Sequence, residues 1–151
     1  TQKKALRVFD MATQKESRAF RESASEQNAL AMSADGALLA VAAVQIDIDI
    51  RRNRRIDTKV VKIRDAKSGQ ELAAFEAHER PIRAVAFFPD SRFLATGAED
   101  RQIKLWDLEA RTAVAALNLQ GSVTALALSG NGRWLAGADD SGRVTIWEVV
   151  K

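Results

Sequence analysis

The chain of 151 residues is 46% hydrophobic and 28% charged, which excludes an intrinsically disordered protein and suits one globular domain. It contains no cysteine, so disulfides and zinc sites with thiolate ligands are excluded. No run of residues is apolar over the length needed to cross a bilayer and no signal peptide is visible, so we expect a cytoplasmic location.

Short apolar runs, separated by turn-forming residues, recur along the whole chain. Alternating apolar residues between Gly, Pro, Asn, Asp or Ser are typical of successive antiparallel strands. In chain order, the predicted strands are residues 4–10, 16–21, 27–33, 37–44, 58–65, 70–76, 82–88, 92–98, 102–107, 112–118, 122–128, 133–138 and 143–149.

The predicted strands repeat with a nearly constant period. Trp106 and Trp147 lie 41 residues apart, and Asp65 precedes Asp107 by 42 residues. Self-similarity at a period of this length indicates a repeat architecture, in which each repeat is one small structural unit.

Residues 78–107 resemble the WD40 repeat of β-propellers. The resemblance rests on His78 followed by a strand, Phe88-Pro89-Asp90, Leu94-Ala95-Thr96-Gly97 and Ile103-Lys104-Leu105-Trp106-Asp107. Each repeat of this family makes one four-stranded blade. The resemblance therefore implies an all-β fold, part of a WD40-type propeller built of four-stranded antiparallel blades.

The resemblance divides the chain, 1–151, into the parts of a single propeller segment. These are a partial blade at 4–21, a blade at 27–76 with an inserted hairpin at 45–57, a complete blade at 78–118, and a last blade at 119–151 that lacks its outer strand.

A closed propeller needs at least four blades, and two complete and two partial repeats fall short of that. The chain begins in mid-blade and ends after a third strand, so we expect the C-terminal portion of a larger propeller. Its ring would close with the missing N-terminal portion or with a second copy of the chain. A half-propeller that self-associates is the alternative.

The inserted hairpin alternates apolar and charged residues. If residues 50 and 56 pair across the intervening arginines, Ile48 faces Thr58 and Asp47 faces Lys59. One face of the hairpin is then apolar and the other charged, and a shift of two residues would preserve this. We expect the isoleucine face to pack against another part of the protein.

A hydrogen-bonded structural tetrad is implied by the resemblance at His78, Thr96, Asp100 and Trp106. The indole N–H would donate to the threonine hydroxyl, which engages the imidazole, which in turn contacts the carboxylate. A buried indole or imidazole needs such partners. A catalytic set of the Ser-His-Asp kind is the alternative interpretation. We favour the structural one and expect no catalytic residue, cofactor or metal ligand.

The basic excess of the chain comes from Arg51, Arg52, Arg54 and Arg55. The net charge is +3, from 23 basic and 20 acidic residues, and without these four arginines 19 basic residues remain. The run could be a solvated hairpin tip, a contact for an acidic protein surface, or a contact for phosphate or nucleic acid.

The family resemblance implies a non-enzymatic scaffold that binds protein partners, and we expect neither nucleic acid nor a membrane as partner. A sensor or regulatory propeller appended to an N-terminal enzyme is the alternative. In either case, loops on one rim would present the contacts. The candidate partner-binding residues are Arg51, Arg52, Arg54, Arg55, Glu79, Arg80, Glu99 and Arg101.

Overall fold

The computed structural model describes residues 5–21 and 26–150. Within these ranges the chain forms β-strands and no helix. Residue 4, where the predicted partial blade begins, lies outside the described residues, as do residues 1–3, 22–25 and 151. The prediction of an all-β fold made of antiparallel four-stranded sheets is confirmed.

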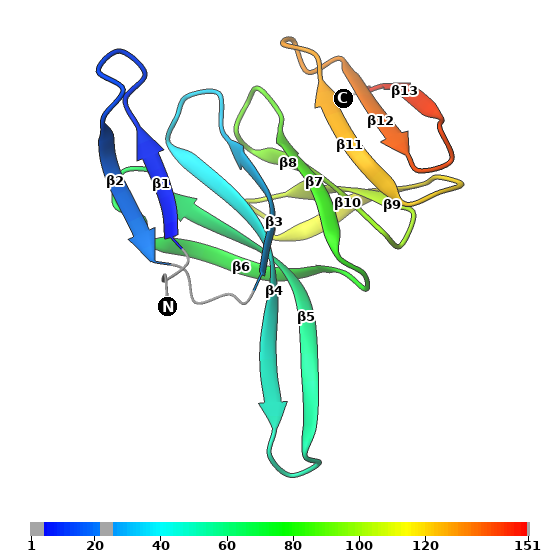
Figure 1. Ribbon diagram of the computed structural model, residues 1–151. Helices are drawn as coiled ribbons and strands as arrows, with labels where there is room; N and C mark the ends of the chain where they lie inside the picture. The colour runs from blue at the N-terminus through cyan, green and yellow to red at the C-terminus, as the bar shows by residue number, and fades with distance from the viewer. Residues whose placement is uncertain (1–4, 22–25, 151) are drawn as a thin grey trace.

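The described strands form four antiparallel sheets, which follow one another in chain order around an arc (Figure 1). The first sheet pairs β1 (Ala5–Phe9) with β2 (Glu16–Arg21). The second has the order β3 (Glu26–Met32), β4 (Leu38–Asp49), β5 (Arg54–Asp65) and β6 (Glu71–His78). The third has the order β7 (Ile82–Phe87), β8 (Phe93–Ala98), β9 (Gln102–Asp107) and β10 (Thr112–Asn118). The fourth has the order β11 (Val123–Leu128), β12 (Trp134–Asp139) and β13 (Val144–Glu148).

The core lies between successive sheets. Alternate residues of a strand point to opposite faces, so the third sheet can contribute to two cores at once. Leu94 packs with Val61 against the second sheet, whereas the adjacent Ala95 packs with Val123 against the fourth. All four side chains are 0% exposed. The third sheet therefore buries one apolar face against the second sheet and the other against the fourth.

One type of turn recurs at the ends of four described strands. An aspartate is the last residue of the strand or follows it directly. Its Oδ1 accepts the N–H groups of the residues two and three positions later, and the fourth residue after it has a positive φ. These hydrogen bonds are the Asx-type turn contacts that favour aspartate at this place. The four pairs are Asp10 with Gln14, Asp49 with Asn53, Asp65 with Gly69, and Asp107 with Arg111.

The same turn fixes the register of the inserted hairpin and shows that the predicted register is wrong. Asp49 pairs with Arg54, Ile48 with Arg55, and Asp47 with Ile56. Residues 50–53 form the loop, because Asp49 caps it and Asn53 takes a φ of 46°. The shift from the prediction is an odd number of residues, so isoleucines and charged residues share both faces.

Three isoleucines of the hairpin stay exposed, contrary to the prediction that they pack against another part of the protein. Ile48 is 71% exposed, Ile50 88% and Ile56 43%. Among the described residues, the pairing of β3 with β4 stops at Val44 and that of β6 with β5 stops at Lys59. Beyond these residues β4 and β5 continue as a two-stranded ribbon that projects from the sheets (Figure 1).

Candidate functional site

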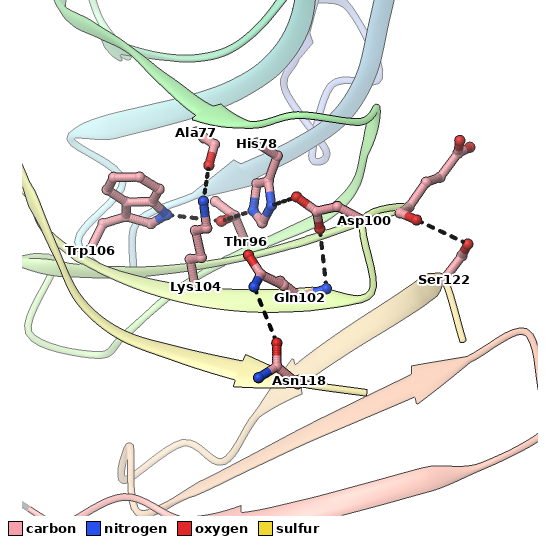
Figure 2. A network of polar contacts seen from close by, with 10 residues as sticks. Ala77, His78, Thr96, Asp100, Gln102, Lys104, Trp106, Asn118 and Ser122 are labelled. Atoms are coloured by element: carbon pink, nitrogen blue, oxygen red, sulfur yellow. Dashed lines mark hydrogen bonds and ion pairs between the residues drawn. The ribbon is translucent and has the colours of Figure 1, made fainter. Parts of the chain in front are cut away.

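The structure brings the four predicted tetrad residues together (Figure 2). His78 Nδ1 lies 2.8 Å from Asp100 Oδ2, and His78 Nε2 lies 2.7 Å from Thr96 Oγ1. Trp106 Nε1 donates to the same hydroxyl over 2.9 Å. His78 is 2% exposed, Thr96 0% and Trp106 7%. The four side chains form one chain of hydrogen bonds, which is buried at Trp106, Thr96 and His78 and part-buried at Asp100.

The directions of these hydrogen bonds follow from the indole, which can only donate, and from the carboxylate of Asp100, which can only accept and so takes the proton of His78 Nδ1. Thr96 Oγ1 accepts the N–H of Trp106, so its own proton is free to be donated to His78 Nε2. Nε2 is then an acceptor, and Nδ1 carries the proton that is donated to Asp100. His78 is therefore a neutral imidazole with its proton on Nδ1.

The tetrad joins two sheets. His78 ends β6 of the second sheet, whereas Thr96, Asp100 and Trp106 belong to β8, to the turn after it and to β9 of the third. Two further contacts cross the same boundary. Lys104 Nζ donates to the carbonyl oxygen of Ala77 over 2.9 Å, and the rings of Phe75 and Trp106 lie 4.7 Å apart.

Three polar residues around the tetrad were not predicted from the sequence (Figure 2). The backbone N–H of Gln102 donates to Asp100 Oδ1 over 3.1 Å, and the Gln102 side chain donates to Asn118 Oδ1 over 3.1 Å. Lys104 is the third. Gln102 and Lys104 occupy alternate positions of β9, and Asn118 ends β10. In the sequence, polar residues at such positions look the same whether they form hydrogen bonds within the protein or face solvent.

The pKa of His78 makes folding dependent on pH. Burial lowers this pKa below its ordinary value of 6.5, and the hydrogen bond and charge of Asp100 offset the effect only in part. In the unfolded chain the imidazole takes up a proton that the folded protein resists. We therefore expect the contribution of His78 to stability to be complete above pH 6.5 and to fall as the pH drops below it.

The measurement is the free energy of unfolding between about pH 8 and about pH 5, compared with that of His78→Ala. His78 is the only histidine, so the difference between the two curves isolates its titration. A difference that stays constant with pH would show that the folded-state pKa of His78 is not lowered.

The predicted partner-binding residues outside the hairpin lie on loops that adjoin one another. Glu79 and Arg80 follow β6, whereas Glu99 and Arg101 lie in the turn between β8 and β9. Backbone hydrogen bonds tie these loops to their neighbours, since the Glu99 N–H donates to the Pro81 carbonyl over 3.0 Å. We call these loops, together with those after β10 and β12, the rim.

The rim holds a polar cleft of about 520 Å³. Arg83 donates to Glu99 from Nε over 2.6 Å and also from a terminal nitrogen. On the other side, Asp140 Oδ1 accepts the N–H of Ser122 over 2.9 Å. The lining residues are Arg83, Glu99, Ser122, Val123, Thr124 and Asp140.

The four hairpin arginines lie elsewhere. All four are exposed, at or beside the tip of the ribbon formed by β4 and β5. The ribbon leaves the second sheet where Lys59 pairs with His78, next to Glu79 and Arg80, and its tip lies well away from the sheets (Figure 1). The structure thus separates the eight predicted contact residues into two groups, the rim loops and the ribbon tip.

In residues 5–21 and 26–150, no group of three or more acidic or histidine side chains is placed to hold a metal ion. The same residues include no helix long and apolar enough to span a membrane.

Comparison with known proteins identifies the repeats. The family model of the WD40 domain, or G-beta repeat, matches residues 69–107 and 114–148. The two matches cover the end of the second sheet, most of the third and the strands of the fourth.

Several characterised proteins are similar to this chain. Target of rapamycin complex subunit wat1 of Schizosaccharomyces pombe is 33% identical over 85 residues, which are 56% of this chain and 27% of that protein. Pre-mRNA-processing factor 19 homolog 2 of Arabidopsis thaliana is 36% identical over 90 residues, which are 58% of this chain and 17% of that protein. General transcriptional corepressor TUP1 of Saccharomyces cerevisiae is 60% identical over 40 residues, which are 26% of this chain and 5% of that protein.

The chain therefore spans about a quarter or less of the length of these relatives. The family assignment rests on three findings that agree: the packed antiparallel sheets, the two matched repeats and the similar proteins. The chain belongs to the WD40-repeat family.

Proposed function

We propose that this chain is a non-enzymatic interaction platform for protein partners and forms part of a larger WD40 propeller. The observation that carries the proposal is the pair of matched repeats on sheets that pack face to face. The names of two similar proteins, a complex subunit and a corepressor, describe proteins that act with others. Propellers leave their loops free for such contacts because their cores lie between the blades.

The rim is the surface that we propose for protein contact. Its charges alternate in sign, with Glu79 beside Arg80 and Glu99 near Arg101, and its loops are held in place by backbone hydrogen bonds. A fixed, mixed-charge surface suits a specific protein partner, because complementary charges select the partner and the orientation. A buried tetrad that holds two sheets together supports this use by keeping the loops in register.

Reversal of one rim charge tests the proposal. We expect Arg101→Glu to lower the recovery of co-purifying proteins roughly tenfold, because a repelling charge then faces the partner. Arg111→Glu is the matched control, since Arg111 is also exposed, also has a positive φ (56° against 68°), and lies at the other end of β9. Quantitative affinity capture with mass spectrometry measures both. Equal recovery from the two variants would contradict a protein contact at the rim.

We further propose that the fourth sheet is covered by another part of the propeller or by a second copy of the chain. Val144 is 69% exposed and Ile146 64%, although both lie in a strand. A separate apolar groove of about 460 Å³ lies between the third sheet and the residues after β13, lined by Phe88, Arg92, Phe93, Leu105, Val114, Ala115, Val149 and Val150. Exposed strands and apolar patches of this kind recruit other chains.

We expect residues 1–151 on their own to self-associate, and light scattering after gel filtration measures this. Ile146→Ser should reduce the association. Val114→Ser, on β10 with 55% exposure, tests the contribution of the groove. A single monomeric species with a cooperative melting transition would contradict the proposed covering of the fourth sheet.

A cytoplasmic location and the lack of a catalytic activity belong to the same proposal. Fluorescence imaging of the tagged full protein checks the location.

A further inference from the structure

The ribbon, residues 45–58, belongs to neither of the surfaces that we propose for protein contact, the rim and the fourth sheet. Its two strands pair only with each other from Gln45–Thr58 to Asp49–Arg54. From Val44 to Asp49 it extends by about 17 Å, at roughly 3.3 Å per residue. A segment of this length with strongly exposed isoleucines indicates a binding element.

The end of the ribbon is apolar and basic at once. Ile48 and Ile50 are 71% and 88% exposed, and Ile50 stands in the loop between the strands. Arg51 and Arg52 follow directly, and Arg54 begins β5. Aliphatic side chains at a protruding end, flanked by arginines, are the composition of elements that enter the interface of a bilayer.

The register distributes these residues around the whole end of the ribbon. Directly paired residues of antiparallel strands lie on the same face, so Ile48 and Arg55 share one face. Ile56 lies on the opposite face, opposite Asp47, next to the pair formed by Asp49 and Arg54. Apolar and basic groups therefore surround the end on all sides.

The nearby aspartates are engaged within the ribbon. Asp49 accepts two loop N–H groups at 3.1 and 3.2 Å, and Arg55 Nε donates to Asp57 Oδ1 over 2.6 Å. This hydrogen bond from Arg55 lowers the pKa of Asp57, which stays ionised and paired. Excess positive charge thus remains at the outermost residues of the ribbon.

We propose that the end of the ribbon, residues 48–56, inserts into the surface of an anionic lipid bilayer. A groove on a protein would engage one face of a two-stranded ribbon, whereas the lipid interface surrounds an inserted end. Isoleucine and arginine lie on both faces of the ribbon, and this distribution fits the lipid interface better than a groove on a protein. The absence of a spanning segment led us to expect no membrane partner, but contact with the surface of a bilayer needs no such segment.

The length of the ribbon has a role in this arrangement. Outside residues 45–58, 19 basic residues stand against 17 acidic ones, whereas residues 48–56 alone carry four arginines and one aspartate, so positive charge is most concentrated at the end of the ribbon. The ribbon extends about 17 Å, and charges are screened over about 8 Å at physiological ionic strength. The ribbon can therefore reach the bilayer while the sheets and the rim stay clear of it.

Co-sedimentation of the full protein with vesicles tests the proposal. We expect binding to vesicles of phosphatidylcholine with phosphatidylserine and little binding to phosphatidylcholine alone. Replacement of Arg51, Arg52, Arg54 and Arg55 by serine should lower the partition coefficient by about fivefold for each arginine. Ile48→Ser and Ile50→Ser should each lower it by about tenfold or more, with the salt dependence retained.

Two control variants make the same kinds of substitution at exposed residues outside the ribbon. Arg80→Ser with Arg101→Ser removes two rim arginines, and Met11→Ser removes an apolar side chain that is 88% exposed in the turn between β1 and β2. Both should bind vesicles as the unchanged protein does. The rim variants also separate this proposal from the protein contact, because loss of protein partners at the rim leaves vesicle binding intact.

Three results would overturn the proposal. Equal binding to neutral and anionic vesicles would show that the arginines do not drive binding. Full binding by the isoleucine variants would show that the ribbon does not insert into the bilayer. The third is binding of polyglutamate with the same dependence on the arginines and isoleucines, together with no binding to vesicles. The ribbon would then be a contact for an acidic protein surface.

Discussion

Thr96→Val is expected to lower the free energy of unfolding by about 1–3 kcal/mol for each buried group that it leaves without a partner. Two groups lose their partner, the indole N–H of Trp106 and Nε2 of His78, both of which contact the Thr96 hydroxyl. Valine has nearly the size of threonine, so the loss measures hydrogen bonding rather than packing. Equilibrium unfolding in denaturant gives the value.

Thr112→Val is the control, because Thr112 is exposed at the start of β10. It should change stability by less than about 0.5 kcal/mol. His78→Ala, which removes the middle of the chain of hydrogen bonds, should cost about 1–3 kcal/mol. A variant of His78 that lost turnover of some substrate at unchanged stability would overturn the structural interpretation of the tetrad.

Gly97→Ala is expected to cost about 1–3 kcal/mol, the usual range for overpacking of a filled core. Gly97 lies in β8 and faces the fourth sheet. An added Cβ would overlap Cγ1 of Val123 and lie 3.0 Å from its Cβ. Val123 is 0% exposed and branched at Cβ, so it cannot rotate away, and the two sheets must separate instead. Thermal and denaturant unfolding measure the loss.

Val123→Ala provides the reciprocal test. It should be destabilising alone, but in its presence Gly97→Ala should cost little, because the space that the new methyl group needs is then empty. Gly130→Ala is the control, since nothing lies within 4 Å of the Cβ that it would add. If Gly97→Ala costs the same with valine and with alanine at position 123, close packing of β8 against β11 does not limit this site.

Much of the fold could be predicted from local patterns. The order of the strands follows from alternating apolar runs and from turn residues, which act over a few neighbouring positions. The residues of the tetrad could be named because the family motif places them at recognisable points of one repeat. Residues 69–107, the first match to the family, contain all four of them.

The register of the ribbon was locally encoded but was predicted wrongly. Asp49 and Asn53 have the spacing of Asp65 and Gly69, which close another turn of the same sheet. The alternation of isoleucine and aspartate suggested a longer loop, and the aspartate that caps the loop decided against it. Comparison of the turns within the sequence would have found this signal.

The tertiary structure alone decided which of these features meet and which stay exposed. Whether Ile48 is buried depends on how far the neighbouring strands extend, and in the described residues their pairing stops at Val44 and Lys59. Likewise, His78 reaches Thr96 across the boundary between two sheets. Alternation and turn chemistry specify a strand and its two faces, because they depend on neighbouring residues. What covers each face depends on the packing of sheets that are distant in sequence, and no local pattern contains that information.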